Sequence, residues 1–187
     1  PRPPGFGKFV ERVGAWPLIE LECVLRCNLK RQIARLNDAG FPAKMASEPE
    51  FYLFEESFEE AHSIGYRDMT AISPNNEDYH LLQTTKEEDV MRAVRNGLYG
   101  AGIPVENSKG EAWAGQEEIN VKYADALTAA DDHVITKNGV KEIAWAAGRA
   151  VTFMAKYDYV AAGSSSHIHQ SLWSKDGKTP VFLDKDA

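Results

Sequence analysis

The sequence lacks several features that would assign it to a class at once. It has no apolar run near the ~20 residues that span a bilayer, and its first residues lack the apolar stretch of a signal peptide. It has no internal repeat and no low-complexity segment. It also lacks a stripe rich in Lys and Arg, and its formal net charge is -7. A basic stripe is the usual footprint of a nucleic-acid binder, so we expect neither a nucleic-acid nor a membrane partner.

Cysteine is scarce as well. The chain has two, Cys23 and Cys27, which are four residues apart in a helical pattern. We interpret them as two free thiols, which fits a reducing compartment and predicts a cytoplasmic protein. A CxxxC metal or redox pair is the alternative.

What is present is an ordinary globular composition. The chain has 187 residues, of which 43% are hydrophobic and 26% charged, enough for one domain with a core. Residues 1–22 are rich in Pro and Gly and show no clear period, so we interpret them as a linker or the remnant of a preceding segment. The domain is expected over residues 23–187.

Hydrophobic periodicity predicts helices and strands in alternation. Apolar stripes predict a first helix over 23–39 and a third over 128–149. The second helix is expected to start at a capping box formed by Thr84 or Thr85 with Glu87 or Glu88, and to end at about Tyr99. Strands are expected over 43–54, 103–111, 117–123, 151–157 and 166–173. The buried stripes are expected to be Val90, Met91, Val94 and Leu98 in the second helix, and Val134, Ile135, Val140, Ile143 and Ala147 in the third. This pattern predicts an α+β fold, in which an antiparallel sheet with inserted helices turns its other face to a polar site.

Polar side chains alternate along three of these strands. Residues two apart share a face of a strand, so Glu48 and Glu50 lie together, and so do Glu118, Asn120 and Lys122. In the last strand His167, His169 and Ser171 share one face, and Gln170 lies on the other.

Carboxylates are expected to converge on this face. Glu111 precedes Glu118 by seven residues, and a tight turn would bring the two together across a hairpin. Several carboxylates and an imidazole in one place repel one another unless cations are present. Such a set suits hard ions such as Mg²⁺ or Mn²⁺ and leaves room for phosphate oxygens, as phosphoryl transfer requires. Taken singly, each of these residues is more typical of a solvated strand face than of a metal site, and only their joint occurrence favours the site.

Four segments of the chain resemble a known family. SEPEFYLF, GIPVENSKGEAWAGQEEIN, VTFMAK and GSSSHIHQSLW are similar to the successive signature segments of glutamine synthetases, in the same order and spacing, from about residue 24 to 183. The resemblance implies a catalytic-domain fold of that type and a cytoplasmic enzyme that forms ring-shaped homo-oligomers.

The resemblance also implies roles for individual residues. It implies two divalent ions, Mg²⁺ or Mn²⁺, in each site. The first would be held by Glu50, Glu111 and Glu118, and the second by Glu48 and His167. Glu106, His169 and Ser171 would contact ATP, and the backbone of Gly163 would contact glutamate. Glu50, Glu118 and His167 would therefore be the catalytic residues.

The implied reaction joins an amine to glutamate in two steps. The side-chain carboxylate of glutamate attacks the γ-phosphate of ATP to give γ-glutamyl phosphate, and ammonia or another amine then displaces phosphate. The metal ions offset phosphoryl charge, and enclosure protects the acyl phosphate from water.

The sequence departs from the family pattern in two respects. Ala162 stands where the glutamate-binding stretch usually has Asn before the glycine, and the AGSSSHIHQSLW form is more similar to γ-glutamyl ligases for an alkylamine or polyamine. The sequence also ends at Ala187, before the family's later segment with its arginines, a further metal-binding glutamate and the flap. We therefore expect an incomplete catalytic domain that is nearly inactive alone.

Two other classes remain as alternatives. A metal-dependent hydrolase also uses an HxH pair at a strand end, but its barrel needs regular βα units that are not evident here. A non-catalytic relative retained for assembly is disfavoured by the intact ligand set.

Overall fold

One long strand, β1 (Ala43–Phe54), organises the sheet in a computed structural model that describes residues 25–182. The strand order is β2-β3-β1-β4, and β5 and β6 also pair with β1. The strands other than β1 are β2 (Val105–Gly110), β3 (Gln116–Val121), β4 (Ala124–Asp125), β5 (Ala150–Thr152) and β6 (Ser166–Leu172). β3, β4 and β5 all run antiparallel to β1. The expected α+β class with an antiparallel sheet and inserted helices is confirmed.

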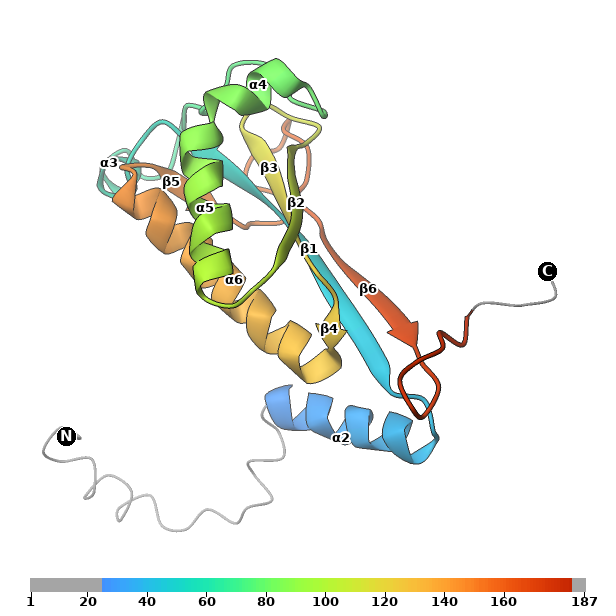
Figure 1. The fold of residues 1–187 in the computed structure, drawn as a ribbon. Helices are drawn as coiled ribbons and strands as arrows, with labels where there is room; N and C mark the ends of the chain where they lie inside the picture. Colours follow the sequence, from blue (N-terminus) through green and yellow to red (C-terminus); the bar gives the residue numbers. More distant parts are fainter. Residues whose placement is uncertain (1–24, 183–187) are drawn as a thin grey trace, which may run out of the picture. The chain divides into compact units, whose positions relative to one another are not determined.

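Two helices cover one side of this sheet, as Figure 1 shows. They are α5 (Glu88–Gly100) and α6 (Ala126–Ala146). The core between helices and sheet contains Phe51 and Leu53 of β1, Ile119 of β3 and the whole predicted stripe of α5. The helices that precede α5 in this unit, α3 (Phe58–Ser63) and α4 (Leu81–Lys86), are short. Because Phe51 and Leu53 point to the helices, alternation turns Glu48, Glu50 and Tyr52 to the opposite face.

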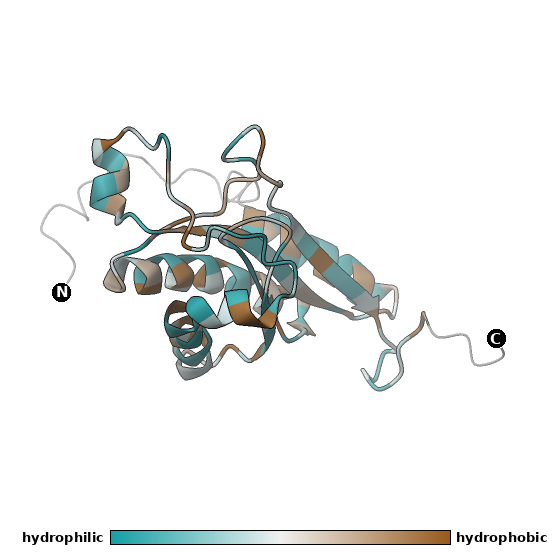
Figure 2. Ribbon diagram, turned by 90° about the horizontal axis from the view of Figure 1, so that it is seen from above, coloured by the Kyte–Doolittle hydropathy of each residue, from teal (hydrophilic) through white to brown (hydrophobic). Residues whose placement is uncertain are grey.

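The predicted inward face of α6 is partly wrong. Val140 is buried, but Val134 and Ile135 are 67% and 47% exposed, and Ala147 is also exposed. The buried positions are Ala126, Ala129, Thr136, Val140 and Ala144. Apolar residues occur all round this helix, so periodicity selected no unique face; Figure 2 shows hydrophobic and hydrophilic residues interspersed along the helices.

The predicted capping box of the second helix is also wrong. Thr84 and Thr85 lie inside the separate helix α4, where both hydroxyls donate to the carbonyl of Leu81. α5 starts after Glu87, whose side chain makes no capping bond. The strand expected over 151–157 ends at Thr152, because the Met154 amide donates to the Thr152 hydroxyl and turns the chain.

The described part of the chain divides into two units. The first, residues 44–171, is described above, and the second contains residues 25–43 and 172–182. In the second, α2 (Leu25–Asp38) is followed by Gly40 with φ +86°, and the Phe41 amide donates to the Leu36 carbonyl, as the Gly40 and Pro42 signals predict. Cys27 is a free thiol. Cys23 and the linker expected over 1–22 lie outside the described residues.

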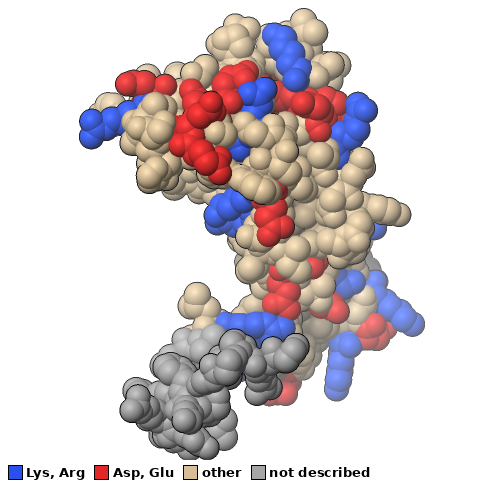
Figure 3. Space-filling view, turned by 90° about the vertical axis from the view of Figure 1, so that its left-hand side faces the viewer, with Lys and Arg blue, Asp and Glu red and all other residues tan. Residues whose placement is uncertain are grey.

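Two surface features bear on partners. Across residues 25–182, every helix is too short or too polar to traverse a lipid bilayer. On the face drawn in Figure 3, the Lys and Arg side chains of the described residues are interspersed with Asp and Glu and form no continuous stripe.

Candidate active site

The pairing of β1 with β3 places the predicted glutamates opposite each other. Glu50 and Glu118 are Cα partners in the antiparallel register, which brings their side chains to the same face. One step along the strands, the Asn120 amide donates to Glu48 Oε2 at 3.2 Å. The convergence that alternation predicted for these two strands is therefore present.

The first carboxylate group consists of Glu50, Glu111 and Glu118. One oxygen of each lies within 4.8 Å of the others. Glu111 reaches the group because its amide donates to the Gln116 carbonyl at 2.7 Å, which closes the turn between β2 and β3. Glu50 and Glu118 are buried and Glu111 is half-buried, so the three carboxyl groups approach one another largely shielded from solvent.

Lys109 partly compensates this negative charge. Its ammonium lies 2.6 Å from Glu118 Oε1 and 3.8 Å from Glu111 Oε1. Burial alone would lower the pKa of Lys109, but its hydrogen bond to Glu118 and the charge of that residue raise it overall. A cation therefore already lies against this group, and the sequence analysis did not anticipate it.

The second group consists of Glu48, Glu118 and His167, whose ligand atoms also lie within 4.8 Å of one another. The Nδ1 atom of His167 is 3.1 Å from Glu48 Oε1, and Nε2 of His169 is 2.9 Å from Glu48 Oε2. The two histidines thus share a face of β6, as their spacing predicts. Glu118 belongs to both groups, although the resemblance implied it for the first alone.

The carboxyl groups of the site differ in their pKa. Burial raises the pKa of Glu118 and of Glu111, and nearby carboxylates add to both effects. Burial also disfavours ionised Glu48, but hydrogen bonds from His169 and His167 and the charge of Lys109 lower its pKa overall. A cation at the first group would offset the repulsion that raises the pKa of Glu111 and Glu118.

Two residues that the sequence analysis missed hold Glu50 in place. The side-chain amide of Gln116 donates to Glu50 Oε2 at 2.9 Å and to the Gly163 carbonyl at 3.0 Å. Ser165 donates to Glu50 through both its hydroxyl and its amide. Strand alternation places Gln116 on the same face as Glu118, so its presence at the site could have been predicted from the sequence. Nothing in the sequence distinguishes Ser165 from its serine neighbours.

Gly163, expected at the glutamate-binding position, is therefore linked to the carboxylate group through Gln116. Its neighbour Ala162 is half-buried, and the Ala162 carbonyl accepts a hydrogen bond of 2.8 Å from the Tyr52 hydroxyl. Tyr52 lies on β1, two residues after Glu50, and is fully buried. The backbone beside the first group is thus tied to the strand that carries Glu48 and Glu50.

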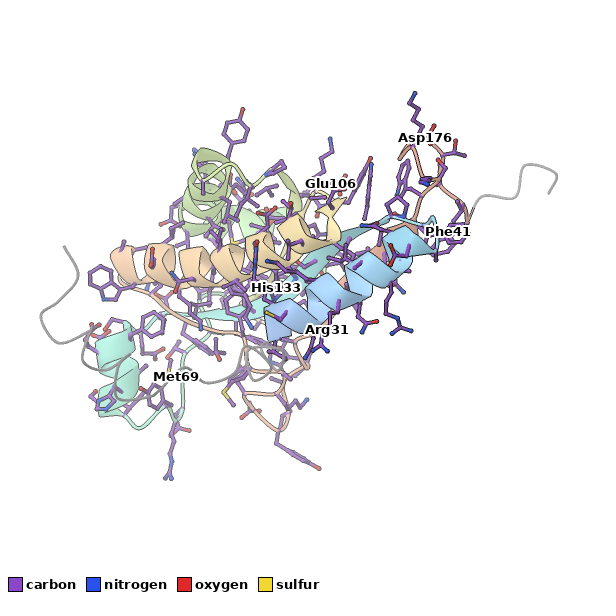
Figure 4. All side chains as sticks on the ribbon, turned by 90° about the horizontal axis from the view of Figure 1, so that it is seen from below. Arg31, Phe41, Met69, Glu106, His133 and Asp176 are labelled. Carbon is purple, nitrogen blue, oxygen red and sulfur yellow. The ribbon has the colours of Figure 1, made fainter. Side chains whose placement is uncertain are left out.

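A pocket of about 320 Å³ adjoins the second group. All three residues expected at ATP, Glu106, His169 and Ser171, line it. Gln170, expected on the opposite face of the strand, also contributes to the lining. Figure 4 labels Glu106, which the structure places on β2.

The donor chemistry fits divalent metal ions. Three carboxylates in one group, and two carboxylates with an imidazole in the other, are ligands that Mg²⁺ and Mn²⁺ accept. The Lys109 ammonium, 2.6 Å from Glu118 Oε1, shows that the first group accommodates a cation. Glu48, Glu50, Glu111, Glu118 and His167, the five residues implied as ligands, are all members of these two groups.

Comparisons with known proteins agree with this geometry. A family model described as "Glutamine synthetase, catalytic domain" matches residues 23–187. The chain is 43% identical over 153 residues to gamma-glutamylethanolamide synthetase GlnA4 of Streptomyces coelicolor, a match that covers 82% of this chain and 33% of that protein. It is 39% identical over 158 residues to glutamate–isopropylamine ligase of a Pseudomonas species, covering 84% and 34% respectively.

A solved structure, "Apo GmaS without ligand", is similar with a TM-score of 0.73 and 27% identity, covering 86% of this chain and 36% of the other. The chain thus spans about a third of the length of the curated relatives it matches. Members of this family use divalent metal, ATP and small-molecule substrates, and they typically oligomerise. The match over residues 23–187 shows that this chain belongs to the glutamine synthetase family.

Proposed function

We propose that the protein of which this chain forms the metal-binding part is an ATP-dependent ligase. It joins the side-chain carboxylate of glutamate to an amine through γ-glutamyl phosphate. The observation that carries the proposal is the pair of groups that share Glu118, because together they offer two adjacent sites for divalent ions beside a pocket of about 320 Å³. Family membership leaves the metal-dependent hydrolase without support.

Different residues of the chain would bind the metal ions, the nucleotide and glutamate. Glu50, Glu111 and Glu118 would hold one ion and Glu48, Glu118 and His167 the other; bound there, the ions would neutralise charge on the transferring phosphoryl group. His169, Ser171 and Glu106 line the pocket in which the nucleotide would bind. The Gly163 backbone would orient glutamate. Gln116 and Ser165 hold the Glu50 carboxylate in its orientation through hydrogen bonds.

The acceptor amine is proposed to be an alkylamine or polyamine, with ammonia as the alternative. Two observations support this. Ala162 lacks the amide group of the Asn that the ammonia-using pattern has, which leaves space next to Gly163. The two curated relatives described above are named for ethanolamide and isopropylamine products or substrates.

We also propose a cytoplasmic location and assembly into homo-oligomers. The free thiol of Cys27 accords with a reducing, cytoplasmic compartment. Ring-shaped homo-oligomers are proposed from family membership.

The test needs a complete catalytic domain. We would place residues 25–182 into the corresponding segment of a glutamine synthetase that uses ammonia, and measure glutamate- and amine-dependent ADP release. We expect turnover, and we expect Glu50→Gln and His167→Ala each to reduce it at least ~100-fold. Each substitution removes a group that would help to stabilise charge in the transition state. Glu142→Gln, an exposed position on α6, is the matched control. A chimera that folds but releases ADP without glutamate or amine would contradict the proposal.

A further inference from the structure

Three more glutamates converge on the other side of β3, away from the site described above. They are Glu77 in the segment before α4, Glu87 at the start of α5, and Glu117, which alternates with Glu118 along β3. All three are at most 1% exposed. One oxygen of each lies within 4.8 Å of the other two.

Most of their oxygens have no partner. Among the described residues, Glu77 Oε2, Glu117 Oε1 and both oxygens of Glu87 are buried without a hydrogen bond. The remaining oxygen of Glu77 accepts from the Gly115 amide at 2.9 Å. Buried polar atoms in native proteins nearly always have partners, so four unpartnered oxygens within one buried group need an explanation.

Burial also makes the ionised group unfavourable without a counter-charge. Three ionised carboxylates at this distance would repel one another strongly, because burial removes the water that would screen their charges. The group must therefore contain either bound protons or a cation. Protons shared between two carboxyls would satisfy individual pairs of oxygens, whereas a cation satisfies all three residues at once.

The surrounding backbone leaves room for this arrangement. Gly110 is the Cα partner of Glu117 in the β2–β3 ladder. A Cβ atom at Gly110 would lie 2.6 Å from Glu77 Cβ and 2.9 Å from Glu77 Oε2. Any other residue at position 110 would therefore displace Glu77 from the group.

The three carboxylates are close enough together to bind one divalent ion. Oxygens bound at about 2.1 to 2.4 Å from an ion can be at most roughly 4.2 to 4.8 Å apart. We infer that Glu77, Glu87 and Glu117 form a buried structural site for a hard divalent cation, separate from the two active-site groups.

Such an ion would stabilise the hairpin of β2 and β3, which carries Glu118 on its other face. The segment after Glu77 is bonded to that hairpin, because the Asp78 amide donates to the Glu111 carbonyl at 2.8 Å and the Tyr79 amide to Gly110 at 3.2 Å. A cation would connect this segment and the start of α5 to β3. It would thereby hold Glu111 and Glu118 in position without touching substrate.

The test counts Mn²⁺ ions in a background that lacks the active-site ligands. In the full 187-residue chain, Glu50→Gln with Glu118→Gln removes charge from both active-site groups. We expect this variant to retain one Mn²⁺ per chain in equilibrium dialysis, with an Mn²⁺-dependent rise in Tm. Adding Glu87→Gln should weaken the retained binding at least tenfold and abolish the rise, whereas adding Glu142→Gln, exposed on α6, should change neither.

Two results would overturn the inference. One is a background variant that binds no Mn²⁺, and the other is retained binding that Glu87→Gln leaves intact. If Glu87→Gln fails to fold, anomalous diffraction at the manganese edge from the unsubstituted chain decides the question. A peak enclosed by the three glutamates supports the site, and its absence there means that the carboxyls hold protons instead.

Discussion

Lys109 puts a positive charge where the first metal ion is expected. Its ammonium lies 2.6 Å from Glu118 Oε1, and its side chain is 28% exposed, so an ion entering this group has to displace it. We predict that Lys109→Met tightens Mn²⁺ binding by about tenfold, or ~1.4 kcal/mol, because the competing charge is removed. Calorimetric titration measures the change. The exposed Lys122→Met is the control, and weaker binding in Lys109→Met would mean that the lysine organises the carboxylates instead.

Gln116 bonds Glu50, a member of the first carboxylate group. The Gln116 amide bonds both Glu50 Oε2 and the Gly163 carbonyl, so Gln116→Leu keeps the volume but frees the carboxylate to rotate. Loss of such an outer partner commonly costs 10- to 100-fold in metal affinity, and we predict a loss of that order. Mn²⁺ titration checks it, with Tm as a measure of folding. Gln32→Leu, exposed on α2, should have no effect, and equal losses in both variants would refute the positioning role.

At the scale of single elements, α6 contains a half-buried histidine, His133, that we expect to make stability depend on pH. Burial and then the charge of Lys137 lower the pKa of His133, and its Nδ1 atom is buried without a hydrogen-bond partner among the described residues. Figure 4 labels this residue, which the structure places on α6. The unfolded chain therefore binds a proton at this position more readily than the folded chain does, and stability is lost as pH falls through about 6.5.

His133→Gln should remove that dependence. We predict that, relative to the unsubstituted chain, the variant becomes progressively more stable as pH is lowered from 7.5 to 5.5. Urea unfolding at several pH values measures the difference in free energy. His62→Gln, exposed on α3, should leave the pH profile unchanged. Parallel profiles for wild type and His133→Gln would show that His133 does not contribute.

Helix α3 illustrates why local signals were only partly sufficient. A true capping box occurs at Ser57, whose hydroxyl accepts from the Glu60 amide while Glu60 accepts from the Ser57 amide. The same S/T-x-x-E pattern near Thr84 forms no such box, because a short separate helix occupies those residues. A capping box needs the S/T-x-x-E pattern, but the structure of the surrounding chain determines whether a given S/T-x-x-E segment forms one.

Over the whole molecule, strand alternation predicted more than helix periodicity did. Glu48, Glu50 and Glu118 converge because alternation on two strands fixes their faces once the strands pair. Glu77 and Glu87 could not be found in this way, since one lies in a loop and the other at a helix start, where no period specifies direction. Lys109 was missed because its cross-strand pairing with Glu118 depends on the register between β2 and β3, which includes an irregularity between Val105 and Asn107.

The proposed acceptor preference belongs to the scale of the assembled site, because it depends on Ala162 together with its neighbours. The half-buried Ala162 precedes Gly163, whose carbonyl connects through Gln116 to Glu50. The Tyr52 hydroxyl fixes the Ala162 carbonyl at 2.8 Å, so the backbone cannot readily move into the space that a larger side chain would fill. An alkyl acceptor could bury its methylene groups there, each worth ~0.8 kcal/mol or nearly fourfold in affinity.

We therefore predict that a complete enzyme carrying this chain prefers a primary alkylamine or polyamine to ammonia. Steady-state kcat/KM at fixed glutamate and ATP, measured for ammonia, ethylamine, isopropylamine and putrescine, checks this preference. Ala162→Asn should reduce kcat/KM for the larger amines at least tenfold relative to ammonia, about 1.4 kcal/mol, because it fills the space and adds a polar group. Ala101→Asn, exposed at the end of α5, should leave the ratio unchanged. If ammonia is preferred tenfold or more by the unsubstituted enzyme, Ala162 does not determine the acceptor and the enzyme makes glutamine.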